Sequence, residues 1–204
     1  MRITGCDISH WNDDAMFRTL LANDTPFFFM KATEGRTYVD KKFRVRASEV
    51  KAKGCGLGLY HYARPENNTP EKEAEHFIKT VALYEDTVIA LDWEGAAEKY
   101  PADWILDWCS KVEAELGRKP MLYLNHAYAS KADKILSRFP LWCAKWGDEP
   151  TGAIGCWDKY TIWQYTNTPY DSDIFNGTIY DFEQIGKPKE IAEEIGHYCG
   201  CCCW

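Results

Sequence analysis

The feature that most constrains the fold of this chain is the alternation of short apolar segments with longer amphipathic ones. Helical patterns cover residues 40–53, 69–84 and 101–116, and they separate early apolar segments from one another. Repeated strand–helix units require crossover connections and therefore predict a parallel sheet. The segments with the length and composition of strands are residues 3–8, 26–32, 57–63, 87–94, 120–125, 141–146 and 161–166.

The residues at the ends of these segments support the same α/β arrangement. Gly54 and Gly117 follow two of the helical patterns at the position of a C-cap glycine, and Pro70 opens the third in its first turn. After about Trp142 the helical patterns stop, and short strands separated by turn residues follow. We therefore predict a barrel that begins as β/α units and closes with plain strands. A doubly wound open sheet is the structural alternative, although no glycine-rich phosphate loop follows the first strand.

Composition restricts both the size of the fold and the class of partner. With 204 residues, of which 46% are hydrophobic and 27% charged, the chain fits one globular domain. We place this domain at residues 1–185 and a charged, Cys-rich tail at residues 186–204. The net charge of −7 argues against binding to a nucleic-acid backbone. No segment approaches the ~20 apolar residues of a membrane-spanning helix.

The nine cysteines indicate a reduced chain. An odd number prevents complete internal pairing, and five of them lie in apolar segments, where free Cys packs as a small hydrophobe. The other four lie within residues 199–203, where zinc binding together with His197, or acylation, are the alternatives to free thiols. Residues 1–14 contain no apolar run before Asp7, so we expect no signal peptide and synthesis in the cytoplasm.

Acidic residues lie at or near the ends of several predicted strands. In a parallel barrel the carboxyl ends of the strands meet at one mouth, which is where active sites are built. We therefore expect these side chains to meet at one rim. They are Asp7, Glu34, Asp92, Glu94, Asp171 and Asp173.

Asp92 and Glu94 are separated by one residue of a strand. Both side chains should therefore point to the same face, with their Cα atoms about 6.6 Å apart, while Trp93 between them faces the helices. Two carboxylates this close raise the pKa of one of them and keep a protonated acid available near neutral pH. Cleavage of a glycosidic bond needs such an acid for the leaving oxygen and a carboxylate to stabilise positive charge on the sugar.

These acids also have structural or metal-binding interpretations. The Asp92–Glu94 pair is compatible with Mg²⁺ or Ca²⁺ binding, Asp7 with a helix cap, and Asp171 and Asp173 with turns. The convergence of several acids on one rim favours catalysis. The five histidines show no HxH or HxxxH spacing, so we expect no metal and no cofactor.

Eight short motifs follow one another along the chain from about Arg2 to about Gly177. They are GCDISHW, FFFMKATEG, GLGLYHYARP, ALDWEG, MLYLN, LWCAKW, IWQYT and DSDIFNG. In order and spacing, this set resembles the glycoside hydrolase family 25 lysozymes, the Chalaropsis-type muramidases common as phage endolysins. The resemblance implies an α/β fold, a flattened TIM-like barrel of five β/α units followed by three further strands.

The resemblance also implies hydrolysis of the β-1,4 bond between N-acetylmuramic acid and N-acetylglucosamine in bacterial peptidoglycan. Glu94 matches the family's general acid. Asp92 matches the acid that orients the substrate acetamido group or stabilises the oxocarbenium-like state. Asp7 and Asp171 match the acids of the first and last strands. Asp173 stands where the family usually has Asn, so the division of roles between it and Asp171 is open. The expected substrate-binding residues are Glu34, Tyr60, Tyr123, Trp142, Gln164 and Asp173.

The strand spacing of Asp92 and Glu94 lies between the carboxyl separations of retaining and inverting glycosidases. We favour a substrate-assisted route, in which the N-acetyl group is the nucleophile, because Asp92 lies beside Glu94 rather than across from it. A chitinase-like glycosidase and a sugar-binding barrel without catalysis are the alternatives. We expect a monomer that acts on the glycan strands of the bacterial wall after phage-induced breach of the membrane.

Overall fold

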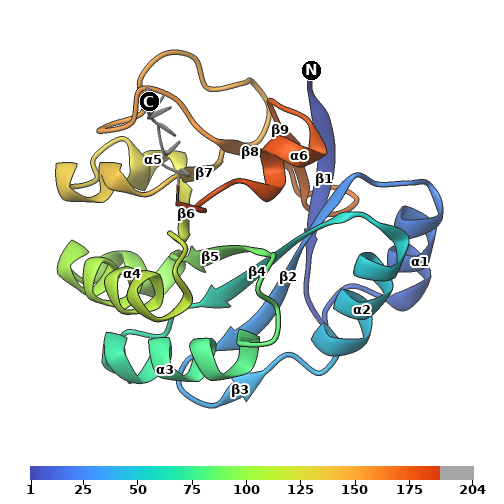
Figure 1. Cartoon of the computed structure of the whole chain (residues 1–204). Coiled ribbons are helices and arrows are strands. Elements are labelled where there is room, and N and C mark those ends of the chain that lie inside the picture. The colour runs from blue at the N-terminus through green and yellow to red at the C-terminus, as the bar shows by residue number, and fades with distance from the viewer. Residues whose placement is uncertain (189–204) are drawn as a thin grey trace, which may run out of the picture.

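The computed structural model describes residues 1–188, and its strands form one sheet that closes into a barrel (Figure 1). The strand order is β1-β9-β8-β7-β6-β5-β4-β2-β3, and β1 also pairs with β2, so eight strands enclose the barrel and β3 extends it at one edge. The strands are β1 (Ile3–Ile8), β2 (Phe27–Glu34), β3 (Tyr38–Val39), β4 (Gly56–Tyr62), β5 (Val88–Asp92), β6 (Met121–Asn125), β7 (Leu141–Ala144), β8 (Ile162–Thr166) and β9 (Ser172–Phe175).

Seven of the barrel strands pair with one another in parallel, and they are β1, β2, β4, β5, β6, β7 and β8. The eighth, β9, is antiparallel to both β8 and β1. Five β/α units are therefore followed by β7, β8 and β9, as the family resemblance implied, and the open doubly wound alternative is wrong. The helices are α1 (Asp14–Ala22), α2 (Phe43–Lys53), α3 (Pro70–Val81), α4 (Ala102–Leu116), α5 (His126–Ala129) and α6 (Ile179–Glu183), with 3-10 turns at Gly95–Lys99 and Lys134–Arg138.

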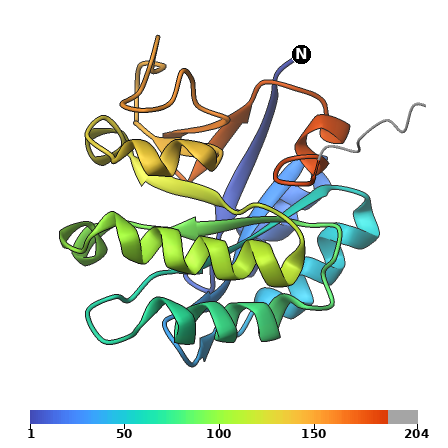
Figure 2. The same ribbon diagram turned by 60° about the vertical axis from the view of Figure 1, so that its left-hand side comes forward.

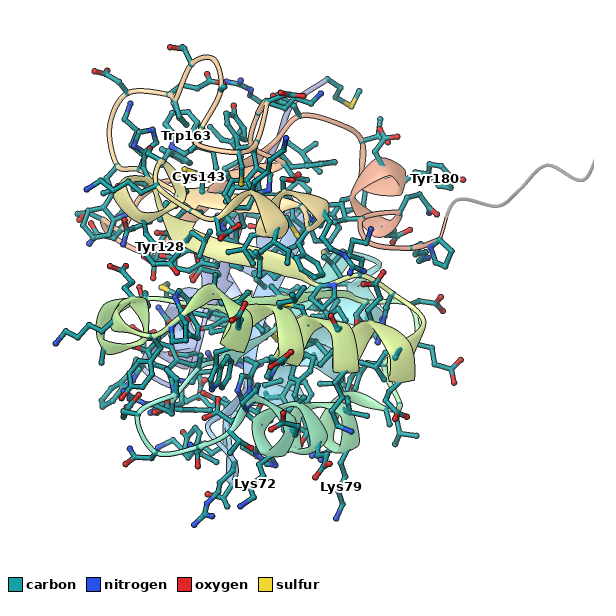
Figure 3. The ribbon with its side chains drawn as sticks, turned by 90° about the vertical axis from the view of Figure 1, so that its left-hand side faces the viewer. Lys72, Lys79, Tyr128, Cys143, Trp163 and Tyr180 are labelled. Carbon is teal, nitrogen blue, oxygen red and sulfur yellow. The ribbon has the colours of Figure 1, made fainter. Side chains whose placement is uncertain are left out.

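The helices pack on the outside of the barrel, and α3 and α4 lie side by side (Figure 2). Lys72 and Lys79 of α3 point away from the sheet, as does Tyr180 of α6 (Figure 3). None of the helices within residues 1–188 is long and apolar enough to cross a bilayer.

The glycine and proline residues predicted to mark helix ends do so in the structure, although α2 begins at Phe43 instead of residue 40 and α3 ends at Val81 instead of residue 84. Helices α2 and α4 stop at Gly54 and Gly117, both left-handed with φ of 77° and 66°, and α3 opens with Pro70. Three short helices lay outside the sequence prediction. Of these, α1 has only two buried residues, and α5 has only four residues, too few to show a helical period. The third, α6, lies after Trp142, where we expected only strands, and its Thr178–Asp181 capping box is the signal that could have revealed it.

Side chains of each strand alternate between two apolar cores. Residues such as Phe28, Met30 and Leu91 face the helices, whereas Phe29 and Ala90 face the barrel interior. Trp93 packs on Trp104 of α4 with ring centroids 5.3 Å apart, as expected for a side chain that faces the helix layer. The free cysteines of residues 1–188 are Cys6, Cys55, Cys109, Cys143 and Cys156, and the cysteines of the tail lie outside the described residues.

The barrel interior is narrow, and it is closed where the strands begin. A Cβ atom on Gly58 would lie 2.2 Å from the Phe29 ring, and one on Gly56 would lie 2.8 Å from Phe182 of α6. Phe182 is fully buried and stacks on Phe27, with ring centroids 4.6 Å apart. Aromatic packing therefore fills this end of the barrel and leaves a cavity only where the parallel strands end.

Candidate active site

A cavity of about 630 Å³ opens at the carboxyl ends of the parallel strands. All but one of the ten site residues expected from the sequence line it, and the exception is Asp173. The lining residues are Asp7, His10, Trp11, Lys31, Glu34, Tyr38, Tyr60, Tyr62, Arg64, Asp92, Glu94, Tyr123, Trp142, Trp146, Gln164 and Asp171. The convergence expected of strand-end acids in a parallel barrel is therefore present in the structure.

Strand β5 positions the two acids of ALDWEG. Val88 and Ala90 face the barrel interior, so Asp92, two residues further on, faces the cavity. Glu94 has an extended backbone, with φ of −148° and ψ of 170°, and therefore continues the alternation. The two carboxyl groups line the same cavity, as the spacing predicted.

Asp92 lies on the cavity floor, only 8% exposed. Its Oδ1 atom is buried and has no hydrogen-bond partner among the described residues. Burial and the nearby carboxylate of Glu94 raise the pKa of Asp92 well above its ordinary value, and the ammonium group of Lys31 opposes them.

Glu94 is less deeply placed than Asp92. Burial, followed by the charges of Asp171 and Glu98, raises the pKa of Glu94, whereas Lys31 lowers it. Glu94 therefore keeps its proton to a higher pH than an exposed glutamate does. A raised pKa in a carboxyl group that faces a cavity is what a general acid requires.

Asp7 enters the cavity from β1. It accepts a hydrogen bond from Gln164 Nε2 at 2.8 Å, and Gln164 Oε1 in turn accepts bonds from Tyr123 Oη and Trp146 Nε1, both at 3.1 Å. Burial raises the pKa of Asp7 well above its ordinary value, and the charges of Asp173 and Asp171 add to this effect. Tyr123 of β6, Gln164 of β8 and Trp146, which follows β7, thus supply a polar network that orients Asp7.

Asp173 lies on β9 and is fully buried, so it is placed beneath the cavity instead of on its lining. Its Oδ1 accepts a 2.8 Å hydrogen bond from Trp142 Nε1. Burial raises the pKa of Asp173 to about 8. Direct substrate contact, which we expected of this residue, is not open to a side chain with no exposed surface. Asp171, two residues earlier, lines the cavity, and burial raises its pKa as well.

Glu34 belongs to a group of charges on the β2 side of the cavity. It accepts hydrogen bonds from Lys31 Nζ at 2.5 Å and Arg64 Nε at 2.7 Å. Burial alone would raise the pKa of Glu34, but these two cations outweigh it and hold the pKa below its ordinary value. Lys31 and Arg64 also lie over the Tyr62 ring, at 4.5 and 4.7 Å from its centroid.

Lys31 and Arg64 were missed as site residues by sequence reasoning. The available signal was a lysine within the apolar segment FFFMKA, since a charged side chain in a buried strand needs a partner. A register shift in β2 after Lys31 places Glu34 on the same face as Lys31, although the two are three residues apart.

Aromatic side chains on the rim were also missed. Trp11 is 84% exposed and Trp146 is 58% exposed, and both line the cavity. Trp11 packs on His10, with ring centroids 4.6 Å apart, and His10 Nδ1 is hydrogen-bonded to Asp40 Oδ2 at 2.8 Å. Exposed indole faces beside a polar cavity suit stacking on sugar rings. The motifs SHW and AKW contain these residues, but local pattern does not distinguish a rim tryptophan from a core one.

The sequence model of "Glycosyl hydrolases family 25" matches residues 6–174. The chain belongs to glycosyl hydrolases family 25. It is therefore a glycoside hydrolase, and the resemblance seen in its motifs is confirmed.

Named members of family 25 are similar over nearly the whole chain. The N,O-diacetylmuramidase of Arthroderma benhamiae is 26% identical, over 91% of this chain and 87% of its own. The N,O-diacetylmuramidase of a Chalaropsis species is also 26% identical, over 90% and 98%. The family GH25 lysozyme structure from Aspergillus fumigatus superimposes with a TM-score of 0.79 at 27% identity and covers 92% of this chain and 100% of that one.

Proposed function

We propose that this family 25 enzyme is an N-acetylmuramidase that cleaves the β-1,4 bond between N-acetylmuramic acid and N-acetylglucosamine in peptidoglycan, with Glu94 as general acid. One observation supports these roles above the others. Glu94 and Asp92 face one cavity from consecutive inward positions, and burial raises the pKa of Glu94, which favours its protonated form. Family membership and the muramidases among the relatives support the choice of substrate.

The proposed reaction begins with proton transfer from Glu94 to the glycosidic oxygen. As the bond to the leaving sugar breaks, positive charge develops at C1. The carbonyl oxygen of the substrate's own acetamido group attacks C1 and forms a cyclic oxazolinium ion. Glu94, now a carboxylate, then removes a proton from water as that water opens the ring, which restores the acid and retains the configuration at C1.

Asp92 has the position that this route requires of an orienting group. Its side chain lines the cavity and keeps 8% of its surface exposed, which places the carboxyl group to accept the acetamido N–H. When this bond forms, the carbonyl oxygen of the acetamido group becomes more nucleophilic, because the developing charge on nitrogen is stabilised by the carboxyl group. Asp7 and Asp171 line the same cavity, and in their ionised forms they would stabilise an oxocarbenium-like transition state.

The rest of the cavity suits a chain of sugars. We propose that Trp11 and Trp146 stack on sugars on either side of the cleaved bond, while Tyr60, Tyr123 and Gln164 contact the sugar in the centre. Because peptidoglycan lies outside the bacterial membrane, we propose that the enzyme acts at the cell wall. We also propose that it acts as a monomer, since one chain supplies the whole set of acids.

Digestion of purified peptidoglycan tests this function directly. Fragments released by the wild-type protein are reduced with borohydride and identified by mass spectrometry. Muramitol at the new reducing ends would identify a muramidase, whereas glucosaminitol ends would assign a different bond and contradict the proposal.

The Glu94→Gln variant tests the role of the acid. It should lose activity by about two orders of magnitude or more, because the amide has no proton to transfer. Glu75→Gln is the matched control, since Glu75 is an exposed glutamate of α3 far from the cavity lining, and its activity should equal that of the wild type. A Glu94→Gln variant with turnover near the wild-type value would refute the assignment.

A further inference from the structure

The turn that carries Trp11 is held by hydrogen bonds along its whole backbone. It comprises residues 9–12, between β1 and α1, and the Trp11 side chain at its third position is 84% exposed. All four backbone N–H groups of the turn donate to acceptors within the protein. These bonds are Ser9 N to Asn12 Oδ1 at 2.8 Å, His10 N to Asp40 Oδ2 at 2.8 Å, Trp11 N to Ser9 Oγ at 3.3 Å and Asn12 N to Ser9 O at 3.1 Å. The exposed indole therefore projects from a backbone that has little freedom to move.

Arg46 of α2 holds the carbonyl groups of this turn. Its Nη1 atom donates to Ser9 O at 2.9 Å, and its Nη2 atom donates to Asn12 O at 2.7 Å and to Asp14 Oδ1 at 2.6 Å. Arg46 is only 3% exposed and lies on the buried face of α2, where the other buried side chains are apolar. A buried cation is costly unless it is paired and hydrogen-bonded. The contacts of this arginine therefore connect α2 to the turn in front of it.

Asp40 fixes the ring beside Trp11. This carboxylate follows β3 and is only 3% exposed. Its Oδ2 atom accepts hydrogen bonds from the backbone N and from Nδ1 of His10, each at 2.8 Å, and its Oδ1 atom accepts one from Lys42 N at 2.9 Å. The His10 ring packs on Trp11, with centroids 4.6 Å apart, and its Nδ1 lies 3.1 Å from the Tyr38 hydroxyl. Asp40 thus anchors a ring that contacts two aromatic side chains of the cavity.

We propose that Arg46 and Asp40 are positioning residues that hold the turn of residues 9–12, so that Trp11 presents its indole face before a sugar binds. Neither side chain lines the cavity, so both act through the turn and not by contact with the glycan. A side chain that is already ordered loses less conformational entropy when a ligand binds, and this preorganisation lowers KM. The inference rests on the proposed function for the nature of the ligand, whereas the order of the turn can be measured without substrate.

Backbone 15N relaxation tests the order of the turn. The Trp11 amide should have an order parameter of about 0.85 in the wild type, the value of a rigid backbone, and below about 0.6 in Arg46→Gln. Arg44→Gln is the matched control, because Arg44 is an exposed arginine of the same helix, and it should keep the wild-type value. A flexible Trp11 amide in the wild type, or a rigid one in Arg46→Gln, would overturn the proposal.

Kinetics on soluble glycan strands separate positioning from a general structural role. Arg46→Gln and Asp40→Ala should each raise KM about fivefold or more and keep kcat within about twofold of the wild-type value, because the acids at the cleaved bond are untouched. Should Arg46→Gln fail to fold, Asp40→Ala alone decides the matter, since it leaves the contacts of Arg46 in place. A lower kcat with an unchanged KM would indicate a general structural role and overturn the proposal.

A double-mutant cycle shows whether Arg46 acts through Trp11. Trp11→Ala should raise KM about tenfold, and the addition of Arg46→Gln should raise it by less than about twofold more, because the indole that Arg46 positions is already absent. Increases that multiply in the double variant would overturn the proposal. A wild-type protein that cleaves no peptidoglycan would contradict the proposed function instead, and the relaxation measurement would still decide whether the turn is held.

Discussion

Replacement of Phe182 by Ala tests how the barrel is closed at the end opposite the active site. Phe182 is fully buried in α6, stacks on Phe27, and makes edge contacts with Phe29 and Phe175 at centroid distances of 5.6 and 5.9 Å. Removal of a buried Phe side chain costs about 3–5 kcal/mol, because transfer energy is lost and a cavity is left behind. For a domain of this size, that loss corresponds to a decrease in Tm of about 6–20 °C.

The assay is equilibrium unfolding in urea, followed by tryptophan fluorescence and by circular dichroism. Tyr180→Ala is the matched control, since Tyr180 is an aromatic residue of the same helix but is 67% exposed, and its free energy of unfolding should change by less than about 0.5 kcal/mol. At 20 °C, Phe182→Ala should keep its activity, because the Phe182 side chain does not line the cavity. A loss below about 1 kcal/mol would refute the packing argument.

This variant also tests the domain boundary. Family 25 similarity covers residues 6–174, whereas α6 begins at Ile179 and contributes Phe182 to the barrel interior. A large loss of stability in Phe182→Ala would support the prediction that the folded domain extends to about residue 185.

Three further predictions concern the cavity and the narrow barrel. Asp92→Asn should lower kcat about 100-fold or more with little change in KM, measured on soluble glycan strands, because Asp92 acts in the transition state. A rise in KM with an unchanged kcat would contradict this role. Because the pKa of Glu94 is raised and its protonated form is the reactive one, kcat/KM should fall as pH rises through that pKa, and a flat profile between pH 4 and 9 would contradict an acid role. In Gly58→Ala, the free energy of unfolding in urea should fall by at least about 1–3 kcal/mol, because the added Cβ would overlap the Phe29 ring. An unchanged free energy of unfolding would contradict the close packing of the barrel interior at this position.

The local sequence pattern was sufficient to predict most of the strands, the three longer helices and the shared face of Asp92 and Glu94. Short apolar segments identified β2 and β5 as strands, and glycine and proline marked the helix ends. The alternation of a strand, with a period of two residues, placed Asp92 and Glu94 on one face and Trp93 on the other. These features depend on a few neighbouring residues, so they can be read without knowledge of the whole fold.

The environments of the other acids depend on pairing between strands that are far apart in the sequence. Barrel closure places β9 beside β1 and thus brings Asp171 and Asp173 to Asp7, more than 160 residues away in the sequence. The register shift in β2 turns Glu34 toward Lys31, and packing beneath the cavity buries Asp173, which sequence reasoning placed in contact with substrate. The sequence by itself therefore determined which acids lie at strand ends. Only the tertiary structure decided which of them are buried, paired with a cation or open to substrate, because burial and charge environment arise from residues that lie far apart in the chain.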